Sequence, residues 1–362
     1  MQIIADRRAL HRIPEPERAL PKTMAYLRCA LSSLRCKLFS PIENSLCAYF
    51  DFGKADTLAF RADCDALQVT EVNDLPYCST HAGYMHACGH DGHMAMLLEL
   101  ARRLDKKSDL PHNALLIFQP AEENVDGAKW ICKENVLENH NVKAIFGVHL
   151  WPGLEAGKVH TRKNELMARS CEVDITVTGK SAHIGKASEG IDALDAGMRI
   201  YTRIRAMEQA LPKDVYRLLN FGHFTSGTVR NAISSKTVLE GTLRTYQPEI
   251  HTHLHDGILR IAKEVEEELG CQVTAKIATG TPPVLNPPDL VDKVSQIVPL
   301  KMLAEPSLTA EDFSEYQLRV PGLFCFLGLG DTPALHSANF NFDENILLKG
   351  ADFFEELAEK FQ

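Results

Sequence analysis

Four short segments of this chain are almost continuously apolar, and no other feature restricts its fold as strongly. Stretches with the apolar spacing of a helix separate them, such as the one that follows His93 and runs to about Asp105. Continuous apolar strands are typical of a parallel sheet whose two faces are both covered by helices. The four segments are residues 57–65, 114–119, 142–150 and 322–328. The sequence therefore predicts an α/β fold built on a mostly parallel sheet.

The pattern changes near residue 167, where the segment 170–178 alternates polar and apolar residues. The elements predicted after this point follow the order βαββαβ, the ferredoxin-like arrangement. They are strands 170–178, 216–225, 236–246 and 272–278, and helices 190–211 and 248–269. A turn-rich linker follows from Thr279, and segment 322–328 with a helix from about Asn345 returns to the first domain. We therefore predict a discontinuous α/β domain over residues 1–166 and 281–362, with an inserted α+β lid over residues 167–280.

The composition narrows the class of protein. The chain of 362 residues exceeds a typical single domain, and its formal net charge of −9 argues against nucleic acids and anionic membranes as partners. It has no run of eighteen apolar residues, and its first residues lack the order of a signal peptide. The ten cysteines form no framework of close pairs, which is typical of reduced thiols. We therefore expect a cytoplasmic protein without a membrane span.

The nine residues from Met85 to His93 contain one thiol, three imidazoles and one carboxylate, directly before an apolar pattern typical of a helix. Soft and borderline ligands gathered at a helix start suit zinc, cobalt, nickel or manganese. The alternative is a polar loop that only caps the helix. Segments elsewhere in the chain decide between these interpretations, because they carry additional metal-binding residue types.

Groups able to bind a metal also occur where predicted strands end, and the carboxyl ends of parallel strands meet at one edge of a sheet. A single histidine at a strand end is usually structural, and a Glu-Glu pair is usually solvated, so each is weak evidence alone. Their joint placement, beside the helix start that carries Cys88 and His90, predicts a metal site. The groups are Asp63, the pair Glu122 and Glu123, His149 and His336.

The adjacent glutamates permit a division of labour. Neighbouring residues that leave a strand point in different directions, so one carboxylate can bind metal while the other takes a proton from the attacking water. Asp63 has a short side chain and could orient an imidazole ligand.

Taken together, these segments resemble a known family across nearly the whole chain. The chain is similar to the superfamily of metal-dependent aminoacylases, dipeptidases and glutamate-type carboxypeptidases, and within it to the amidohydrolase branch. That branch includes N-acyl-amino-acid amidohydrolases, hippurate hydrolases and auxin-conjugate hydrolases. The matching segments are residues 8–15, 61–67, 86–93, 118–123, 147–152, 182–183, 241–244, 311–314 and 335–336, together with Asn231.

The resemblance implies a site for two divalent metal ions, with zinc, manganese, cobalt or nickel as the candidate metals. It implies Glu122 as the general base. Two neighbouring metals could share a ligand, and we expect Cys88 to be that ligand, although the sequence leaves the bridging ligand open. The implied metal ligands are Cys88, His90, Glu123, His149 and His336.

The resemblance also assigns roles to the predicted lid, which in this family mediates formation of a homodimer. His183, Asn231 and Arg244 match positions that bind the carbonyl or carboxylate of the substrate, in some relatives across the dimer. An imidazole or an amide can stabilise a tetrahedral oxyanion, and a guanidinium can grip a carboxylate with two hydrogen bonds.

The resulting expectation is hydrolysis of the amide of an N-acyl amino acid, most simply an N-acetyl one, to a carboxylic acid and a free amino acid. A dipeptidase or carboxypeptidase of the same superfamily is the alternative, and a catalytically idle metal-binding protein is a more remote one. Departures from the usual family pattern at Cys64, Gln68, Ser234 and Thr309 leave the substrate open.

Overall fold

The computed structural model describes residues 1–124 and 126–362, and the chain divides into two compact units. The first unit contains Met1–Leu166, Val284–Glu305 and Glu311–Gln362, and the second contains Met167–Pro283 and Pro306–Ala310. Residues 306–310 return to the second unit, whereas the predicted boundaries placed them in the first domain. This return depends on hydrogen bonds between distant residues: Ala168 N–H donates to the Thr309 carbonyl (2.8 Å), and the Tyr246 hydroxyl donates to the Ser307 carbonyl (2.6 Å).

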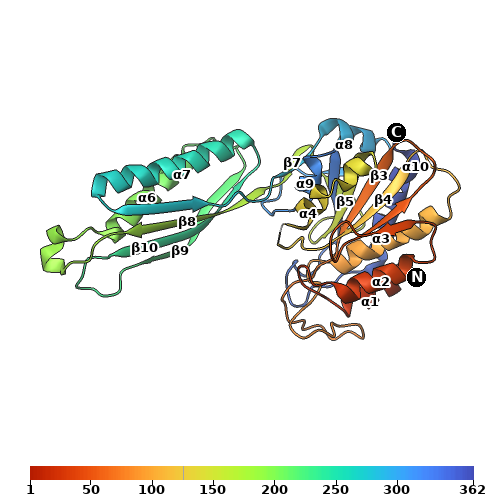
Figure 1. The fold of residues 1–362 in the computed structure, drawn as a ribbon, viewed down its shortest axis with the longest axis horizontal. Helices are drawn as coiled ribbons and strands as arrows, with labels where there is room; N and C mark the ends of the chain where they lie inside the picture. Colours follow the sequence, from red (N-terminus) through yellow and green to blue (C-terminus); the bar gives the residue numbers. More distant parts are fainter. Residues whose placement is uncertain (125) are drawn as a thin grey trace. The chain divides into compact units, whose positions relative to one another are not determined.

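The first unit contains a mostly parallel sheet of eight strands (Figure 1). Its central strands β4, β3, β5 and β14 are parallel, so their carboxyl ends lie at one edge, as the apolar segments predicted. In sheet order the strands are β1 (Lys37–Phe39), β2 (Leu46–Phe50), β4 (Asn113–Gln119), β3 (Thr57–Asp63), β5 (Val142–Trp151), β14 (Gly322–Gly328), β6 (Val159–Thr161) and β13 (Leu300–Met302). A separate pair is formed by β7 (Asn164–Met167) and β12 (Val284–Asn286).

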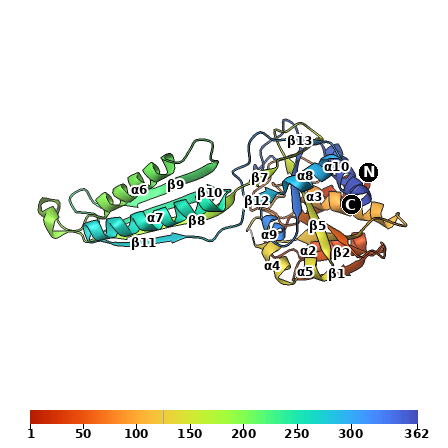
Figure 2. The same ribbon diagram turned by 90° about the horizontal axis from the view of Figure 1, so that it is seen from above.

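Helices cover both faces of this sheet, so every residue of β3, β4 and β14 is buried. On one face, α3 packs against β3, β4 and β5 and contacts α1, α2 and α10. Helices α1 and α2 lie beside α3 in Figure 1, and α10 lies beside it in Figure 2. On the other face, α4 contacts β4 and α5 contacts β5. The helices of this unit are α1 (Gln2–His11), α2 (Pro21–Leu31), α3 (His90–Asp105), α4 (Gly127–Lys133), α5 (Val136–Asn139), α8 (Pro288–Ser295), α9 (Ser314–Gln317) and α10 (Leu347–Lys360), with a 3-10 turn η2 (Glu344–Ile346).

The second unit, which we call the lid, is an antiparallel sheet with two helices on one face (Figure 1). Its sheet order β11-β8-β10-β9 and its chain order βαββαβ confirm the predicted ferredoxin-like arrangement. The inward residues of alternating strands form its core with α6 and α7. The elements are β8 (Arg169–Thr178), η1 (Ile184–Glu189), α6 (Ala193–Gln209), β9 (Arg217–Ser226), β10 (Lys236–Thr245), α7 (Pro248–Leu269) and β11 (Gln272–Ile277).

In the part of the chain that the structure describes, none of the helices combines the length and the apolar character needed to cross a membrane.

Candidate metal centre

The turn that carries Glu122 and Glu123 is held by a single buried carboxylate. Glu122 N–H donates to Asp65 Oδ1 (3.0 Å) and Glu123 N–H donates to Asp65 Oδ2 (3.1 Å). Ala121, just before the turn, has a φ of +56°, in the left-handed region that residues other than glycine seldom occupy. Asp65 therefore fixes the direction in which both glutamates leave the end of β4. Sequence reasoning did not assign it a role.

His90 is the first residue of α3, and its free ring nitrogen faces the glutamates. Its Nδ1 donates to the Asp65 carbonyl (2.8 Å), so the lone pair lies on Nε2. That atom lies 3.8 Å from Glu123 Oε1 and 3.9 Å from Glu122 Oε2, and it has no hydrogen-bond partner among the described residues. Burial lowers the pKa of His90, but Asp63, Asp65 and Glu123 together raise it to about 10. The surroundings therefore favour a positive charge at this point.

Two glycines allow α3 to start so close to β5. Gly89 has a φ of +85°, a left-handed conformation that glycine adopts without strain. A Cβ atom on Gly92 would lie 2.6 Å from Leu150 Cδ1, which is closer than packing permits. These positions bring the histidines of α3 against the end of β5.

His149, near the end of β5, is oriented through the Leu150 peptide. His149 Nδ1 donates to the Leu150 carbonyl (2.7 Å), which leaves the Nε2 lone pair free to face Cys88 Sγ at 3.4 Å. Leu150 N–H donates to His93 Nε2 (2.9 Å), and His93 Nδ1 donates to Asp63 Oδ1 (2.6 Å). Both nitrogens of His93 are thus occupied within the protein. Asp63 holds His93 and acts on His149 only indirectly, whereas sequence reasoning suggested that Asp63 orients a metal ligand itself.

Cys88 lies at the centre of the remaining donors. Its Sγ is 3.3 Å from His336 Nε2, and His336 Nε2 is 3.8 Å from Glu123 Oε1. The loop residue His336 has a φ of +64°, and its N–H donates to the Ala87 carbonyl (2.8 Å). Burial, followed by Glu123 and Glu122, raises the pKa of Cys88 well above its usual value. A thiolate at this position therefore requires a neighbouring cation.

These donors fit borderline divalent cations. Cys88, His90 and His149 form one group, and Cys88, Glu123 and His336 form another, with the donor atoms of each group within 4.8 Å of one another. Cys88 belongs to both groups. Glu123 Oε1, like His90 Nε2, is buried without a hydrogen-bond partner among the described residues. Sulfur, imidazole and carboxylate donors that face one another without protein partners are typical of zinc-type sites.

Behind the glutamates, Arg61 joins three buried carboxylates, and the sequence analysis gave no role to two of them, Glu311 and Asp312, or to Arg61 itself. It donates to Asp63 Oδ2 (2.7 Å), Glu311 Oε1 (2.9 Å) and Asp312 Oδ1 (2.8 Å). One guanidinium balances only part of this negative charge. Burial, Glu311 and Glu123 raise the pKa of Glu122 well above its usual value. The sequence signal for Arg61 was its position as a charged residue within an apolar strand, because a buried charge needs buried partners.

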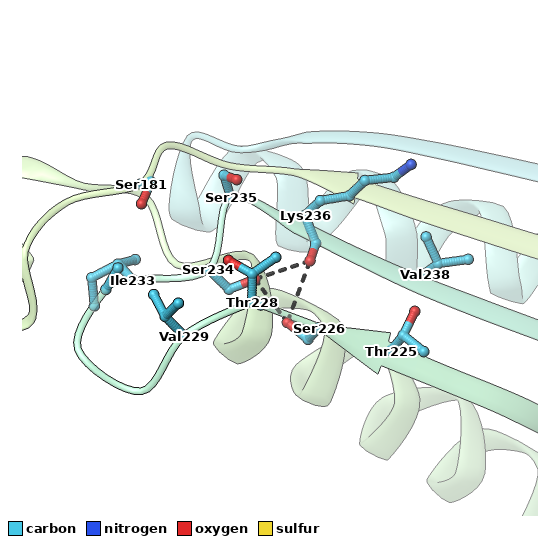
Figure 3. A pocket seen from close by; sticks show the side chains of 12 residues that line it. Ser181, Thr225, Ser226, Thr228, Val229, Ile233, Ser234, Ser235, Lys236 and Val238 are labelled. Carbon is cyan, nitrogen blue, oxygen red and sulfur yellow. Dashed lines mark hydrogen bonds between the residues drawn. The ribbon is translucent and has the colours of Figure 1, made fainter.

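In the lid, the structure brings His183 and Asn231 together. Ile184 N–H donates to the Asn231 carbonyl (3.0 Å), and both His183 and Asn231 have exposed side chains. His183 Nδ1 accepts from Gly185 N–H (3.2 Å), so its Nε2 is available. Figure 3 shows the adjoining pocket of about 260 Å³, where the Ser226 and Ser234 hydroxyls bond to each other (2.8 Å) and fix the loop before Lys236.

Arg244 lies at the other end of the lid. The pair of His183 and Asn231 adjoins the Lys236 end of β10, whereas Arg244 is near the last residue of that strand and pairs with Ser170. Eight residues of strand separate Lys236 from Arg244, which is about 26 Å. The half-buried guanidinium has no ion pair or hydrogen bond among the described residues, and burial lowers its pKa. One lid therefore does not bring the three predicted substrate residues to one place.

Comparison with known proteins gives a consistent result. The model of the family described as peptidase family M20/M25/M40 matches residues 59–360. An uncharacterized hydrolase of Staphylococcus aureus is 34% identical over 371 aligned positions, which cover 98% of this chain and 97% of that protein.

Two solved structures are similar over nearly the full length. A protein from methicillin-resistant Staphylococcus aureus has a TM-score of 0.92 at 28% identity and covers 98% of this chain, with 95% of its own chain matched. The YXEP protein of Bacillus subtilis, a dinuclear metal-binding peptidase of the M20 family, has a TM-score of 0.86 at 30% identity, with 99% of this chain and 96% of that chain covered.

Proposed function

The chain belongs to peptidase family M20/M25/M40 and is a hydrolase of amide bonds, and on this premise we propose that it hydrolyses N-acyl, most simply N-acetyl, amino acids. The observation that carries the proposal is the buried Glu122 carboxyl beside a set of sulfur, imidazole and carboxylate donors that lack protein partners. The products are a carboxylic acid and a free amino acid.

Two divalent cations would be held by Cys88, His90, Glu123, His149 and His336. The shared position of Cys88 in both donor groups supports a bridging thiolate, and the dinuclear YXEP relative supports the number of metals. Bound cations of this type polarise a carbonyl and make water more acidic near neutral pH. Zinc, manganese, cobalt and nickel all suit these donors.

Glu122 would act as the general base and then as the general acid. Its carboxylate removes a proton from the attacking water as the C–O bond forms, and it later delivers that proton to the nitrogen of the leaving amine as the C–N bond breaks. The raised pKa of Glu122 supports this role, because a carboxylate with a raised pKa is a stronger base. Asp63 contributes as a positioning residue, since it acts through His93 and the Leu150 peptide on His149.

Arg244 would bind the free carboxylate of the amino-acid portion. A half-buried guanidinium without an ion partner among the described residues is suited to a carboxylate from outside the chain. This feature favours a substrate with a free acid at one end. His183 and Asn231 would assist the carbonyl oxygen with hydrogen-bond donors.

A homodimer formed through the lid would explain how residues at opposite ends of the lid can act on the same substrate. His183 and Asn231 adjoin the Lys236 end of β10, and that end is about 26 Å from Arg244 along the strand, so all three can serve one small substrate only if two chains contribute. The edge strand β9 pairs with β10 alone among the described strands, and Leu194 and Met198 on α6 are exposed (45% and 47%). An open sheet edge beside apolar side chains favours a second copy.

The ten cysteines are all free thiols, which supports a location in a reducing compartment such as the cytoplasm.

A substrate panel tests the proposed reaction. Metal-depleted protein would receive zinc, manganese or cobalt, and amine release would be measured from N-acetyl amino acids, N-benzoyl amino acids and dipeptides with a free amino terminus. We expect turnover of the N-acyl amino acids to exceed that of the dipeptides. Faster cleavage of the dipeptides would instead support the dipeptidase alternative.

A further inference from the structure

Helix α7 belongs to the lid (Figure 1). Two of its histidines are one helical turn apart and lie on the same side of the helix. His251 and His255 are separated by four positions, and their ring centroids are 5.9 Å apart with planes inclined at 41°. Residues four apart project from one face of a helix, so two such imidazoles can converge on one point. The intervening His253 projects from the other side of the helix and is exposed.

Neighbouring side chains occupy one nitrogen of each ring. His255 Nδ1 donates to Asp256 Oδ1 (2.8 Å), which places the lone pair on Nε2. His251 Nδ1 contacts Thr245 Oγ1 (3.4 Å). Neither Nε2 atom has a hydrogen-bond partner among the described residues. An imidazole held by a carboxylate on one nitrogen, with the other nitrogen free, is the usual arrangement of a metal-binding histidine.

The charges around the pair are mixed. Asp256 supplies a carboxylate beside His255, which favours a cation, whereas the Arg169 guanidinium, which donates to the Thr279 carbonyl (3.2 Å), opposes positive charge at His251. Burial, followed by Arg169 and His255, lowers the pKa of His251. This shift favours the neutral imidazole, which can offer a lone pair.

We propose that His251 and His255 form a two-imidazole site on the lid for a divalent transition metal such as zinc. This site uses none of the residues of the metal centre in the first unit. Paired imidazoles suit zinc, copper, nickel and cobalt, whereas the hard cations magnesium and calcium require oxygen ligands. Water would complete the coordination, because the two side chains are only partly buried.

The test measures zinc bound per chain by equilibrium dialysis and elemental analysis, on protein already loaded with zinc. We expect the His251→Ala, His255→Ala double variant to bind one zinc fewer per chain than the unchanged protein. His253→Ala is the matched control, since it removes a histidine of the same segment from the other side of α7, and it should keep the full number. This difference counts the lid site independently of how many ions the metal centre holds.

Asp256→Asn provides a graded variant. Loss of a carboxylate that orients a metal-binding imidazole weakens metal affinity about 10- to 100-fold, and we expect a shift of this size in the zinc dissociation constant of the lid site. Added zinc should also raise the unfolding midpoint of the unchanged protein and of His253→Ala more than that of the double variant, because a ligand that binds only folded protein stabilises it.

Equal zinc content in the double variant and the unchanged protein would overturn the proposal. So would an equal loss in His253→Ala, which would indicate unspecific capture by a histidine-rich segment. Amide hydrolysis should be unaltered in all three variants, so failure of this site and failure of the proposed enzymatic function are separate outcomes.

Discussion

Asp65 combines several tasks in one residue, since its two carboxylate oxygens hold the backbone of Glu122 and Glu123 and its carbonyl holds His90. We expect Asp65→Asn to lower kcat and metal affinity about 10- to 100-fold, because the amide turns one acceptor into a donor that faces a backbone N–H. Enzyme kinetics and elemental analysis measure both effects. Asp74→Asn, at an exposed position in the same unit, is the control and should leave both unchanged.

Glu122 and Glu123 are neighbours with different expected roles. Glu122→Gln keeps the shape of the side chain but cannot accept a proton, so we expect it to retain its metal and lose at least about 10²–10⁴-fold in kcat. Glu123→Gln should lose metal instead, because an amide oxygen is a weaker ligand than a carboxylate. Metal content and kcat of both variants distinguish the roles. Near-normal turnover by metal-loaded Glu122→Gln would refute the assignment of the base.

At the scale of single elements, β10 carries Arg244 close to its end. If Arg244 binds the substrate carboxylate, the charge-assisted contact contributes roughly 1.5–3 kcal/mol. Arg244→Ala should then lower kcat/KM by about 10- to 100-fold on a free-acid substrate. It should change kcat/KM far less for the matching amide-capped substrate. Equal losses on both substrates would show that Arg244 supports the lid and does not bind the carboxylate.

The contact between α1 and α3 should depend on pH. His11 Nδ1 lies 2.8 Å from Asp91 Oδ2, and His11 Nε2 lies 3.2 Å from Glu71 Oε1. Burial lowers the pKa of His11, but Asp91 and Glu71 outweigh it and raise that pKa overall. The hydrogen bond from His11 helps to lower the pKa of Glu71 to about 2, although burial opposes this shift.

The sign of the effect follows from these shifts. Because the pKa of His11 is higher in the folded state than in the unfolded state, protonated His11 stabilises the folded protein. This stabilisation is complete at pH values below the unfolded-state pKa of about 6.5, and it is lost as the pH rises through the folded-state pKa. The lowered pKa of Glu71 stabilises the folded protein at pH values above the unfolded-state pKa of about 4.3, and this stabilisation is lost as the pH falls. We therefore expect His11→Gln to lower the unfolding midpoint more at pH 6 than at pH 9. Thermal unfolding of metal-loaded protein at both values checks this, and an equal difference at both would contradict it.

Secondary structure was predictable where packing follows a regular pattern. The predicted strand at β14 and the predicted helix at α7 match the structure, because each has a clear apolar period. The helix predicted over residues 190–211 is shorter, because the Asp192 side chain caps the start of α6 by accepting from Leu194 N–H (2.9 Å), and the helix ends at Gln209. Helix α1 was not predicted, since Asp6, Arg7 and His11 occupy buried positions where apolar residues would reveal a helix.

The metal-binding residues of the candidate site were predictable from the sequence, whereas the residues that position them were less so. Strand ends and a helix start pointed to Cys88, His90 and the residues after β4, because these positions share one edge of a parallel sheet. The contacts of Asp65 with two backbone N–H groups depend on the left-handed Ala121, which no local pattern indicates. The role of His93, on α3, depends on a hydrogen bond from the Leu150 N–H of β5, which is distant in the sequence.

At the scale of the whole molecule, the proposed homodimer predicts complementation between inactive variants. Glu122→Gln lacks the base, and we expect His183→Ala to lack a group that acts in the partner's site. In a mixed dimer, the chain with intact Glu122 meets a partner with intact His183, so one of its two sites is complete. A re-equilibrated equal mixture should therefore recover roughly a quarter of the normal activity. No recovery from a mixture shown to contain mixed dimers would mean that His183 acts within its own chain.

The insertion of the lid between β7 and β12 has a consequence for the order in which the protein matures. During synthesis, Cys88, His90, Glu123 and His149 emerge first, and the whole lid follows before β14 and His336 are made. Strand β14 lies in the middle of the eight-stranded sheet, between β5 and β6. The first unit therefore waits with an incomplete core while the lid, whose strands and helices are nearly continuous in sequence, can already fold on the ribosome. We expect metal capture to be a late event that follows the closing of the sheet around a strand from the last tenth or so of the chain.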